Sequence, residues 1–347
     1  MNFCSDNTAG AHPKILAALS AANGGPAMPY GNDELTRKVE RRIAELFERD
    51  CAVFLVGTGT SANALALAAL APNYGAVFCH PESHINMDEC GAPEFFTGGA
   101  KLVGIQGAHA KIAAADLDRA IKTAGIGVVH HVQPAAVSIT QATEAGTVYR
   151  PAEIAALAAV AHKHGLTLHM DGARFANALV QVGCTPAEMT WKAGIDALSF
   201  GATKNGAFAA EAVVFFDPAR AASFGYRRKR AGHLWSKMRF LAAQLDAYLD
   251  GGLWLDNARH ANRMAAELAR GLGAIKAVRL EHPVEANELF VTLPETVIRG
   301  LEADGFRFYR WMDETSTTLR LVTSFETDPA HVAAFVTSAR RHAAAAA

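Results

Sequence analysis

Two stretches decide the expected fold: LTLHMDGARFANA (residues 166–178) and DALSFGATKNG (residues 196–206). In the first, an apolar run ends at Asp171, and in the second, an apolar run ends shortly before Lys204. Short apolar runs of this kind predict buried strands. Polar residues directly after such strands lie at the carboxyl edge of an open α/β sheet, where these sheets bind ligands. We therefore expect Asp171 and Lys204 at one sheet edge.

The same pattern extends on both sides of these stretches. Strands are expected at AVFLV (52–56), GVVHHV (127–132), LTLHM (166–170), IDALSF (195–200) and EAVVFF (211–216). Helices are expected at TSANALALAAL (60–70) and PAEIAALAAVAHKHG (151–165). Strands that alternate with helices predict a mainly parallel sheet covered by helices, which is an α/β fold.

A glycine pair marks the expected domain joint. A long helix, LWSKMRFLAAQLDAYL (234–249), is followed by Gly251-Gly252, which ends it. Beyond the pair come an expected helix (258–273), strands within VRLEHP (278–283) and ELFVTL (288–293), a helix (295–304) and a strand within LRLVTSF (319–325). We predict an N-terminal segment and large α/β domain over residues 1–250 and a small α+β C-terminal domain over residues 251–347.

Composition limits the classes of partner. The 33 Lys and Arg residues nearly balance the 34 Asp and Glu residues, and no long apolar run resembles a membrane span. The five cysteines, an odd number without a C-x-x-C pair, argue against a disulfide framework and a zinc knuckle. The first residues, MNFCSDNTAG, lack a basic region followed by an apolar run. We expect a cytoplasmic protein whose partners are small molecules and copies of itself, with no nucleic acid and no membrane.

Asp171 and Lys204 together suggest a definite chemistry. A carboxylate can keep a pyridine nitrogen protonated, which makes the ring an electron sink, while an amine can form a Schiff base with an aldehyde on that ring. Either residue alone is more often an ordinary edge carboxylate or an exposed lysine. The pair, each after a strand, favours the cofactor.

A third element, VFLVGTGTSANALAL (53–67), predicts a strand, a turn and the start of a helix. Free backbone N–H groups and the helix dipole at Thr58, Gly59 and Thr60 suit a phosphate dianion. Glycine turns and Ser or Thr caps are common, so this turn is weak evidence alone. It is neither a Walker A loop nor a G-x-G-x-x-G motif.

The segment HPESHINMDECGAPEFF (80–96) offers several imaginable metal ligands, namely Cys79 just before it, His80, His84, Glu89 and Cys90. Their spacing matches no usual zinc site, so we expect no metal. His84 is better explained by an imidazole stacked on the cofactor ring, with a plain surface histidine as the alternative. Arg320 lies among apolar neighbours in TTLRLVTSF (317–325), where an arginine usually has a carboxylate partner, either structural or from a substrate.

With these residues in place, nearly the whole chain resembles the pyridoxal-phosphate (PLP)-dependent, fold-type-I L-threonine aldolases, in particular their low-specificity bacterial branch. The resemblance rests on SDNTAG (5–10), YGND (30–33), GTGTSAN (57–63), DECGAPEFF (88–96), SITQATEAGTVYRP (138–151), LHMDGARF (168–175), TWKAGIDALSFGATKNG (190–206), YRRKRAGHLWSKMRFLAAQ (226–244) and EHPVEAN (281–287). It implies a PLP-dependent transferase-like large domain and reversible retro-aldol cleavage of L-threonine, L-allo-threonine and related L-β-hydroxy-α-amino acids to glycine and an aldehyde. It also implies a homotetramer with shared sites.

The resemblance also implies roles for single residues. Lys204 matches the lysine that forms the Schiff base, and Asp171 matches the partner of the pyridinium nitrogen. Thr58, Gly59 and Thr60 match the phosphate turn, and His84 matches the ring-stacking histidine. The substrate carboxylate is expected at Ser5, Arg174 and Arg320, with Arg174 also near the cofactor. Tyr30, Lys229 and Arg239 match positions that approach cofactor and substrate from a neighbouring subunit.

Two positions depart from another branch of the family. That branch has a second active-site histidine where this chain has Thr143, and a tyrosine where this chain has Asp88. By analogy His84 is a candidate proton acceptor for the β-hydroxyl, either directly or through a water; the alternative is that ring stacking is its only role. No residue of the sequence is identified that would hold the β-hydroxyl in one geometry, which favours low specificity between threonine and allo-threonine.

Three other functions remain open from the sequence. Another fold-type-I PLP enzyme, such as an aminotransferase or a β-eliminating lyase, would share Lys204, Asp171 and the phosphate turn. A non-catalytic protein of the same fold and a metal-dependent aldolase are the remaining alternatives.

Overall fold

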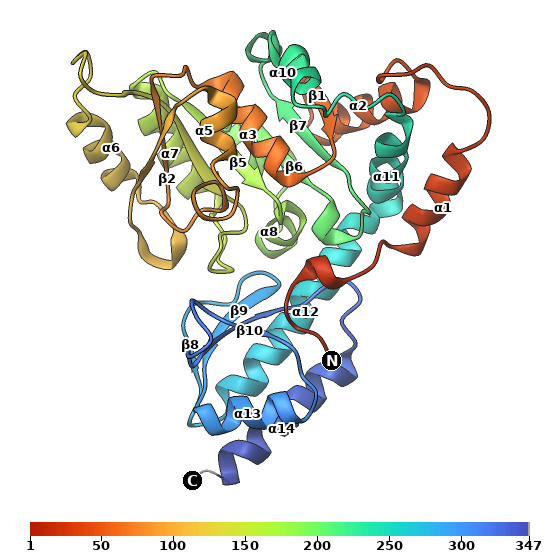
Figure 1. The fold of residues 1–347 in the computed structure, drawn as a ribbon, viewed down its shortest axis with the longest axis vertical. Helices are drawn as coiled ribbons and strands as arrows, with labels where there is room; N and C mark the ends of the chain where they lie inside the picture. The colour runs from red at the N-terminus through yellow and green to blue at the C-terminus, as the bar shows by residue number, and fades with distance from the viewer. Residues whose placement is uncertain (346–347) are drawn as a thin grey trace.

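The computed structural model describes residues 1–345. It consists of a wide body built on a seven-stranded sheet and a narrower body built on a four-stranded sheet (Figure 1). The chain begins in the narrower body, traverses the wide one and returns to the narrower body at its C-terminus.

The seven-stranded sheet is mainly parallel, as expected. Its strand order is β1 (Ala52–Val56), β7 (Glu211–Phe215), β6 (Ala197–Gly201), β5 (Thr167–Gly172), β4 (Gln133–Thr140), β2 (Gly75–Cys79) and β3 (Lys101–Gly104). β7 runs antiparallel to β1 and β6, and the remaining pairs are parallel. β5 and β6 are direct neighbours, with Asp171 in register with Ser199. The predicted α/β fold with a mainly parallel sheet is confirmed.

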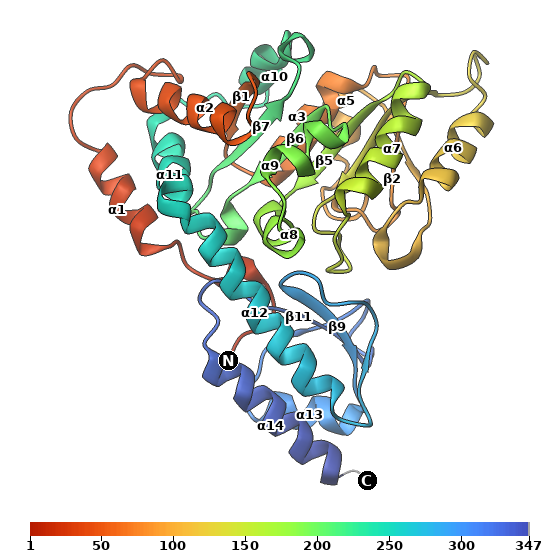
Figure 2. The same ribbon diagram turned by 180° about the vertical axis from the view of Figure 1, so that it is seen from behind.

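Helices cover both faces of this sheet. α3 and α5 lie in front of it in Figure 1, and α7 and α8 lie on the opposite side, as Figure 2 shows. The helices of the wide body are α1 (Pro13–Ala22), α2 (Glu34–Leu46), α3 (Gly59–Leu70), α4 (His84–Met87), α5 (Ala92–Thr97), α6 (Ala114–Thr123), α7 (Pro151–Lys163), α8 (Phe175–Val182), α9 (Pro186–Met189), α10 (Phe224–Arg230) and α11 (Arg239–Leu249). Within residues 1–345, none of the helices is long and apolar enough to cross a membrane.

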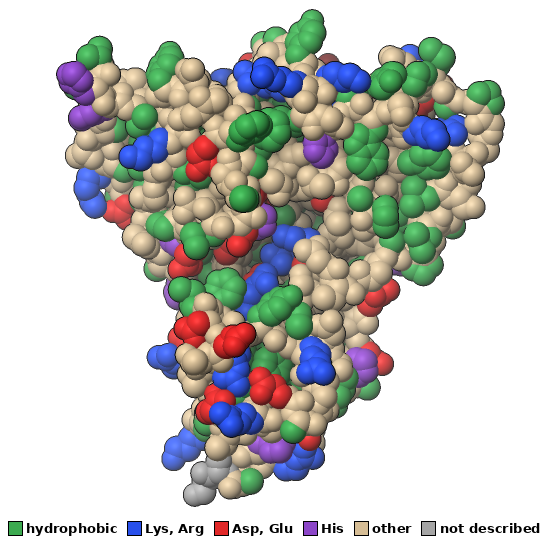
Figure 3. All heavy atoms as spheres, viewed as in Figure 1, with side chains coloured by type: hydrophobic (Ala, Val, Ile, Leu, Met, Phe, Trp, Pro, Cys, Tyr) green, Lys and Arg blue, Asp and Glu red, His purple; other side chains and the backbone are tan. Residues whose placement is uncertain are grey.

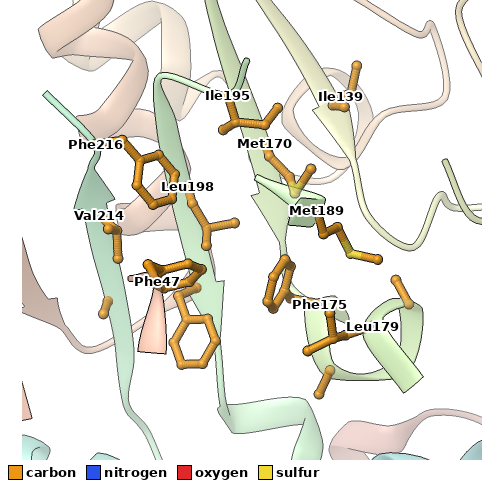
Figure 4. Close-up of a cluster of buried hydrophobic side chains, with 14 of the residues drawn as sticks. Phe47, Ile139, Met170, Phe175, Leu179, Met189, Ile195, Leu198, Val214 and Phe216 are labelled. Carbon is orange, nitrogen blue, oxygen red and sulfur yellow. The ribbon is translucent and has the colours of Figure 1, made fainter. Parts of the chain in front are cut away.

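The core behind the sheet is built from aromatic and branched side chains of strands and helices together. Phe47, which follows α2, meets Phe216 edge to face at 5.2 Å between ring centroids. Figure 4 shows both rings beside Leu198 of β6, with Phe175 of α8 close by. Because interiors are close-packed, this cluster holds the carboxyl ends of β5 and β6 in one fixed arrangement.

The narrower body contains the order β10 (Tyr309–Arg310), β11 (Thr318–Val322), β9 (Glu288–Thr292) and β8 (Arg279–Leu280), all antiparallel. α13 (Glu295–Ala303) and α14 (Pro329–Ala345) pack with it. Strands and helices are mixed here as the sequence predicts for a small α+β unit.

Two segments tie the bodies together. α12 (Leu253–Gly273) begins in the core of the wide body with Trp254 and ends in the core of the narrow one with Leu268 and Leu272. The first residues also belong to the narrow body, because Phe3 packs edge to face on Phe335 at 5.2 Å and its N–H donates to the carbonyl of Arg307. The division between residues 250 and 251 therefore stays a prediction.

The prediction of a strand at residues 127–132 is wrong. These residues form turns, and β4 begins only at Gln133. The Gln133 side chain closes the turn, since it accepts from the Gly127 N–H and donates to the carbonyls of Val128 and His131. Val129 is 92% exposed, so the β-branched run here is not a buried strand.

The helix expected from residue 234 begins only at Arg239. Residues 234–238 form bends and turns instead, and the Ser236 carbonyl accepts from the Tyr30 N–H at 3.1 Å. A tertiary contact thus replaces the first turn that the apolar pattern predicts.

Candidate active site

A cavity of about 580 Å³ lies at the carboxyl ends of β5 and β6, where the two bodies meet. Figure 3 shows a hollow at this junction in which basic and acidic side chains gather. The expected site residues that line the cavity are Ser5, Thr58, Gly59, Thr60, His84, Asp171, Arg174, Lys204 and Arg320. Asp171 and Lys204, which the sequence predicts at one sheet edge, therefore line the same cavity.

Asp171 is held rigidly at the end of β5. Its Oδ1 accepts from the Ala173 N–H at 3.0 Å, and its Oδ2 accepts from the side-chain amide of Asn63 at 2.8 Å. The residue is only 3% exposed, yet it lines the cavity. A buried carboxylate that faces a cavity suits a cationic partner, such as the protonated nitrogen of a pyridine ring.

A hydrogen-bond chain runs from Asp171 to His84. The Asn63 amide also donates to Oε1 of Glu89 at 2.8 Å, and the same oxygen lies 2.8 Å from Nδ1 of His84. The hydrogen bond to Glu89 raises the pKa of His84, and burial raises the pKa of Glu89. The chain therefore fixes the imidazole at the cavity wall, with its Nδ1 turned toward Glu89.

His84, Glu89 and Asp171 also lie close enough to be imagined as a metal site, since their ligand atoms lie within 4.8 Å of one another. However, the Asn63 amide donates hydrogen bonds to both carboxylates. An N–H donor has no lone pair for a metal, so the donor set fits a hydrogen-bond relay better. The expectation of no metal stays a prediction.

The N-terminus of α3 forms an open cradle. Thr58 is the N-cap, and its hydroxyl accepts from the Ser61 N–H at 3.2 Å. A Cβ at Gly59 would meet no protein atom within 4 Å, whereas one at Gly57 would come within 2.7 Å of Trp235. The turn thus has open space at Gly59 beside free N–H groups, which suits a phosphate.

Lys204 lies in the short helix η4 (Thr203–Asn205), directly after β6. The next residue, Asn205, is anchored by hydrogen bonds from its amide to the Tyr248 hydroxyl and to the Trp254 carbonyl, both at 2.8 Å. Gly206 then takes a φ of 114°, and a Cβ there would come within 2.9 Å of Asn257. These constraints hold the half-buried Lys204 in a turn at the cavity wall.

The two arginines form one network with two carboxylates. Arg174 binds Asp6 in a bidentate pair at 2.8 and 3.1 Å, and its Nη1 lies 3.2 Å from Oε2 of Glu288. Arg320 donates from Nε to the other oxygen of Glu288, and its guanidinium lies over the Trp311 ring. Burial opposes the charge of Arg174, but the charges of Asp6 and Glu288 outweigh it and raise its pKa. The carboxylate partner expected for Arg320 is thus Glu288.

Three expected residues lie outside the cavity of their own chain. Lys229 Nζ lies 4.8 Å above the centre of the Tyr30 ring, and Arg239 donates to the Gly25 carbonyl at 2.8 Å. Tyr30 is 45% exposed. Their expected role in a neighbouring subunit's site stays a prediction.

The two departures also have defined places. Thr143 is fully buried, and its hydroxyl pairs with that of Thr147 at 2.8 Å rather than lining the cavity. Asp88 is exposed and lines the cavity. The next residue after Thr143, Glu144, lines the cavity as well.

Sequence reasoning did not assign several polar residues to their place in this site. Glu144, Glu211 and Glu288 line the cavity, and Asn63 and Glu89 connect Asp171 to His84. Burial raises the pKa of Glu211 to about 7, and its Oε2 accepts from the Ala202 N–H at 2.7 Å. The available signal was a carboxylate next to an apolar stretch, such as Glu211 at the start of EAVVFF, but such carboxylates are too common to be singled out.

Comparison with known proteins settles the family. The beta-eliminating lyase family model matches residues 2–296. The chain belongs to this family. It is 47% identical to a protein of Pseudomonas aeruginosa described as "Low specificity L-threonine aldolase", over 94% of this chain and 93% of that one. A second such protein, from a Pseudomonas species, is 45% identical over 95% and 94%. The solved structure of Leishmania major threonine aldolase matches with a TM-score of 0.92 and 32% identity over 99% of both chains.

The relay through Asn63 generates a prediction. Asn63→Ala removes one hydrogen bond from each of two buried carboxylates, and losing a buried hydrogen bond to a charged group costs about 1–3 kcal/mol. We expect a lower free energy of unfolding in urea and weaker retention of added PLP. Asn86→Ala, which removes an exposed amide that bonds only locally, is the control. Unchanged stability and PLP retention in Asn63→Ala would show that the hydrogen bonds of Asn63 stabilise neither the fold nor the bound cofactor.

Proposed function

We propose that this protein is a low-specificity L-threonine aldolase, a PLP-dependent carbon–carbon lyase. It cleaves L-threonine, L-allo-threonine and related L-β-hydroxy-α-amino acids such as phenylserine to glycine and an aldehyde, reversibly. The observation that carries the proposal is the single cavity that joins Lys204, Asp171, Arg174 and Arg320 in a chain of this family. The family supports the lyase class and the cofactor that the sequence predicts.

The residues of the cavity suit PLP. Thr58, Gly59 and Thr60 would hold its phosphate, Asp171 its ring nitrogen and Lys204 its aldehyde carbon, with His84 against the ring. Bound there, the cofactor supplies an electron sink for the pair released when the Cα–Cβ bond of the substrate breaks. The buried Asp171, which accepts hydrogen bonds from two neutral N–H donors, would keep this ring cationic by pairing with its protonated nitrogen.

The arginine network suits the substrate carboxylate. Arg320 and Arg174 present guanidinium groups at the cavity wall, and Ser5 stands beside Asp6 at the same wall. Guanidinium groups bind carboxylates through paired, charge-assisted hydrogen bonds. Held in this way, the substrate is oriented before any bond breaks.

We also propose a homotetramer in the cytoplasm. Tyr30, Lys229 and Arg239 would complete the site of a neighbouring subunit, which agrees with their position outside their own cavity. Tyr226 of α10 is 82% exposed and is available for such a contact.

The direct test measures products. The protein loaded with PLP, incubated separately with L-threonine and L-allo-threonine, is expected to release glycine and acetaldehyde from both. Lys204→Ala is expected to lose a visible absorption band and nearly all release, because it lacks the amine. Transfer of the amino group to a keto acid without glycine would point to an aminotransferase. Release that survives borohydride but is lost to a chelator would point to a metal-dependent aldolase.

The charge of the arginine network generates a further prediction. Arg174 and Arg320 are balanced by Asp6 and Glu288, so the network has no net charge. Glu288→Gln leaves one positive charge for the substrate carboxylate, and we expect KM for L-threonine to fall roughly 3- to 10-fold, about 1 kcal/mol of binding. Glu281→Gln, which lies outside the cavity and pairs with Arg279, is the control. A raised KM in Glu288→Gln would show instead that Glu288 positions the arginines.

A further inference from the structure

A buried carboxylate with a free oxygen lies in the loop between β4 and α7. Oε1 of Glu144 accepts the backbone N–H of His84 at 2.8 Å. Its Oε2 is buried and has no hydrogen-bond partner among the described residues. Glu144 lines the same cavity as Lys204 and Asp171. A buried acceptor without a donor costs free energy, so its retention calls for a ligand or a task.

The surroundings of Glu144 set its proton affinity. Burial, followed by the negative charge of Asp171, raises its pKa to about 7, against the opposing effects of the His84 N–H and side chain. The other charged or titratable groups that interact with it are Arg174, Cys79 and Tyr149. A general base works best when it gains and loses a proton near the operating pH.

Apart from the exposed Asp88, the other carboxylates and the histidine of the cavity hold hydrogen bonds or ion pairs. Nδ1 of His84 is bonded to Glu89, and the raised pKa of His84 favours its protonated form. Glu288 is paired with both arginines. Glu211 accepts from the Ala202 N–H and, unlike Glu144, has no buried oxygen without a hydrogen-bond partner among the described residues. Thr143 is not among the lining residues, its hydroxyl is bonded to Thr147, and it has no basic group. Glu144 thus offers a free, buried acceptor. It directly follows Thr143, the position at which another branch of the family has an active-site histidine.

We propose that Glu144 is the catalytic base that takes the proton of the substrate's β-hydroxyl, an assignment that rests on the proposed function. The O–H bond breaks and the proton binds Oε2, while the O–H electron pair becomes the second bond of the aldehyde C=O. The Cα–Cβ bond breaks and its pair stays at Cα. A solvent proton then binds Cα to give glycine, and Glu144 returns its proton to solvent, so atoms and charges balance.

Glu144→Gln in the PLP-loaded enzyme is the test, because the amide oxygen still accepts from His84 while the base is lost. We expect kcat for L-threonine cleavage to fall about 10²- to 10⁴-fold. PLP content and the dissociation constant of glycine are expected to match the wild type. Exchange of the α-hydrogen of glycine with D₂O, which involves no β-hydroxyl, is expected to continue at the wild-type rate. Glu48→Gln, which alters an exposed carboxylate paired with Lys192, is the matched control.

Two pH measurements accompany it. In the wild type, kcat/KM is expected to fall as the pH drops below about 7, because a protonated Glu144 cannot accept a proton, and Glu144→Gln is expected to lose this limb. Infrared difference spectra of the cofactor-free and loaded protein are expected to show carboxylic acid C=O bands that titrate near pH 7. Glu144→Gln is expected to lose one band and keep that of Glu211.

Different outcomes separate the failures. Wild-type protein that releases no glycine overturns the proposed function and this assignment with it. If the wild type is active, near-normal cleavage by Glu144→Gln overturns the assignment alone. Equal loss of cleavage and of glycine exchange also overturns it, because Glu144 would then only support His84.

Discussion

The buried carboxylate of Asp171 is the constraint around which the site is arranged. A charge at the end of a buried strand is costly unless hydrogen bonds and an opposite charge compensate it. Asn63 and the Ala173 N–H supply the hydrogen bonds, and the cavity leaves room for a cationic ring. Because the Asn63 amide also donates to Glu89, the same requirement fixes His84 at the cavity wall.

The site also depends on the junction between the two bodies, because residues from both of them line one cavity. Asp6 comes from the N-terminal segment, Arg174 from the start of α8, and Glu288 and Arg320 from the small sheet. Their ion pairs span this junction, so substrate binding and the relative placement of the bodies depend on the same charges. Phe3 anchors the N-terminal segment in the core of the narrow body. α12 packs into the cores of both bodies and so connects the two sides of the junction.

Much of the wide body was predictable because its strands are short apolar runs bounded by helical patterns. Asp171 and Lys204 could be placed at one sheet edge for the same reason, and the cavity contains both. The run at residues 127–132 misled because β-branched residues also occur in an exposed turn, which Gln133 closes through contacts that no pattern encodes. The roles of Glu144, Glu288 and Asn63 could not be predicted, because each depends on hydrogen bonds or ion pairs with residues that are distant in sequence.

We propose that Asp171 keeps the cofactor ring protonated, and the most direct measurement is the ¹⁵N NMR spectrum of the holoprotein with PLP labelled at the ring nitrogen. The structure predicts a protonated nitrogen, with a shift and one-bond coupling to hydrogen that persist at neutral pH. An unprotonated ring nitrogen in the wild-type protein would contradict the account.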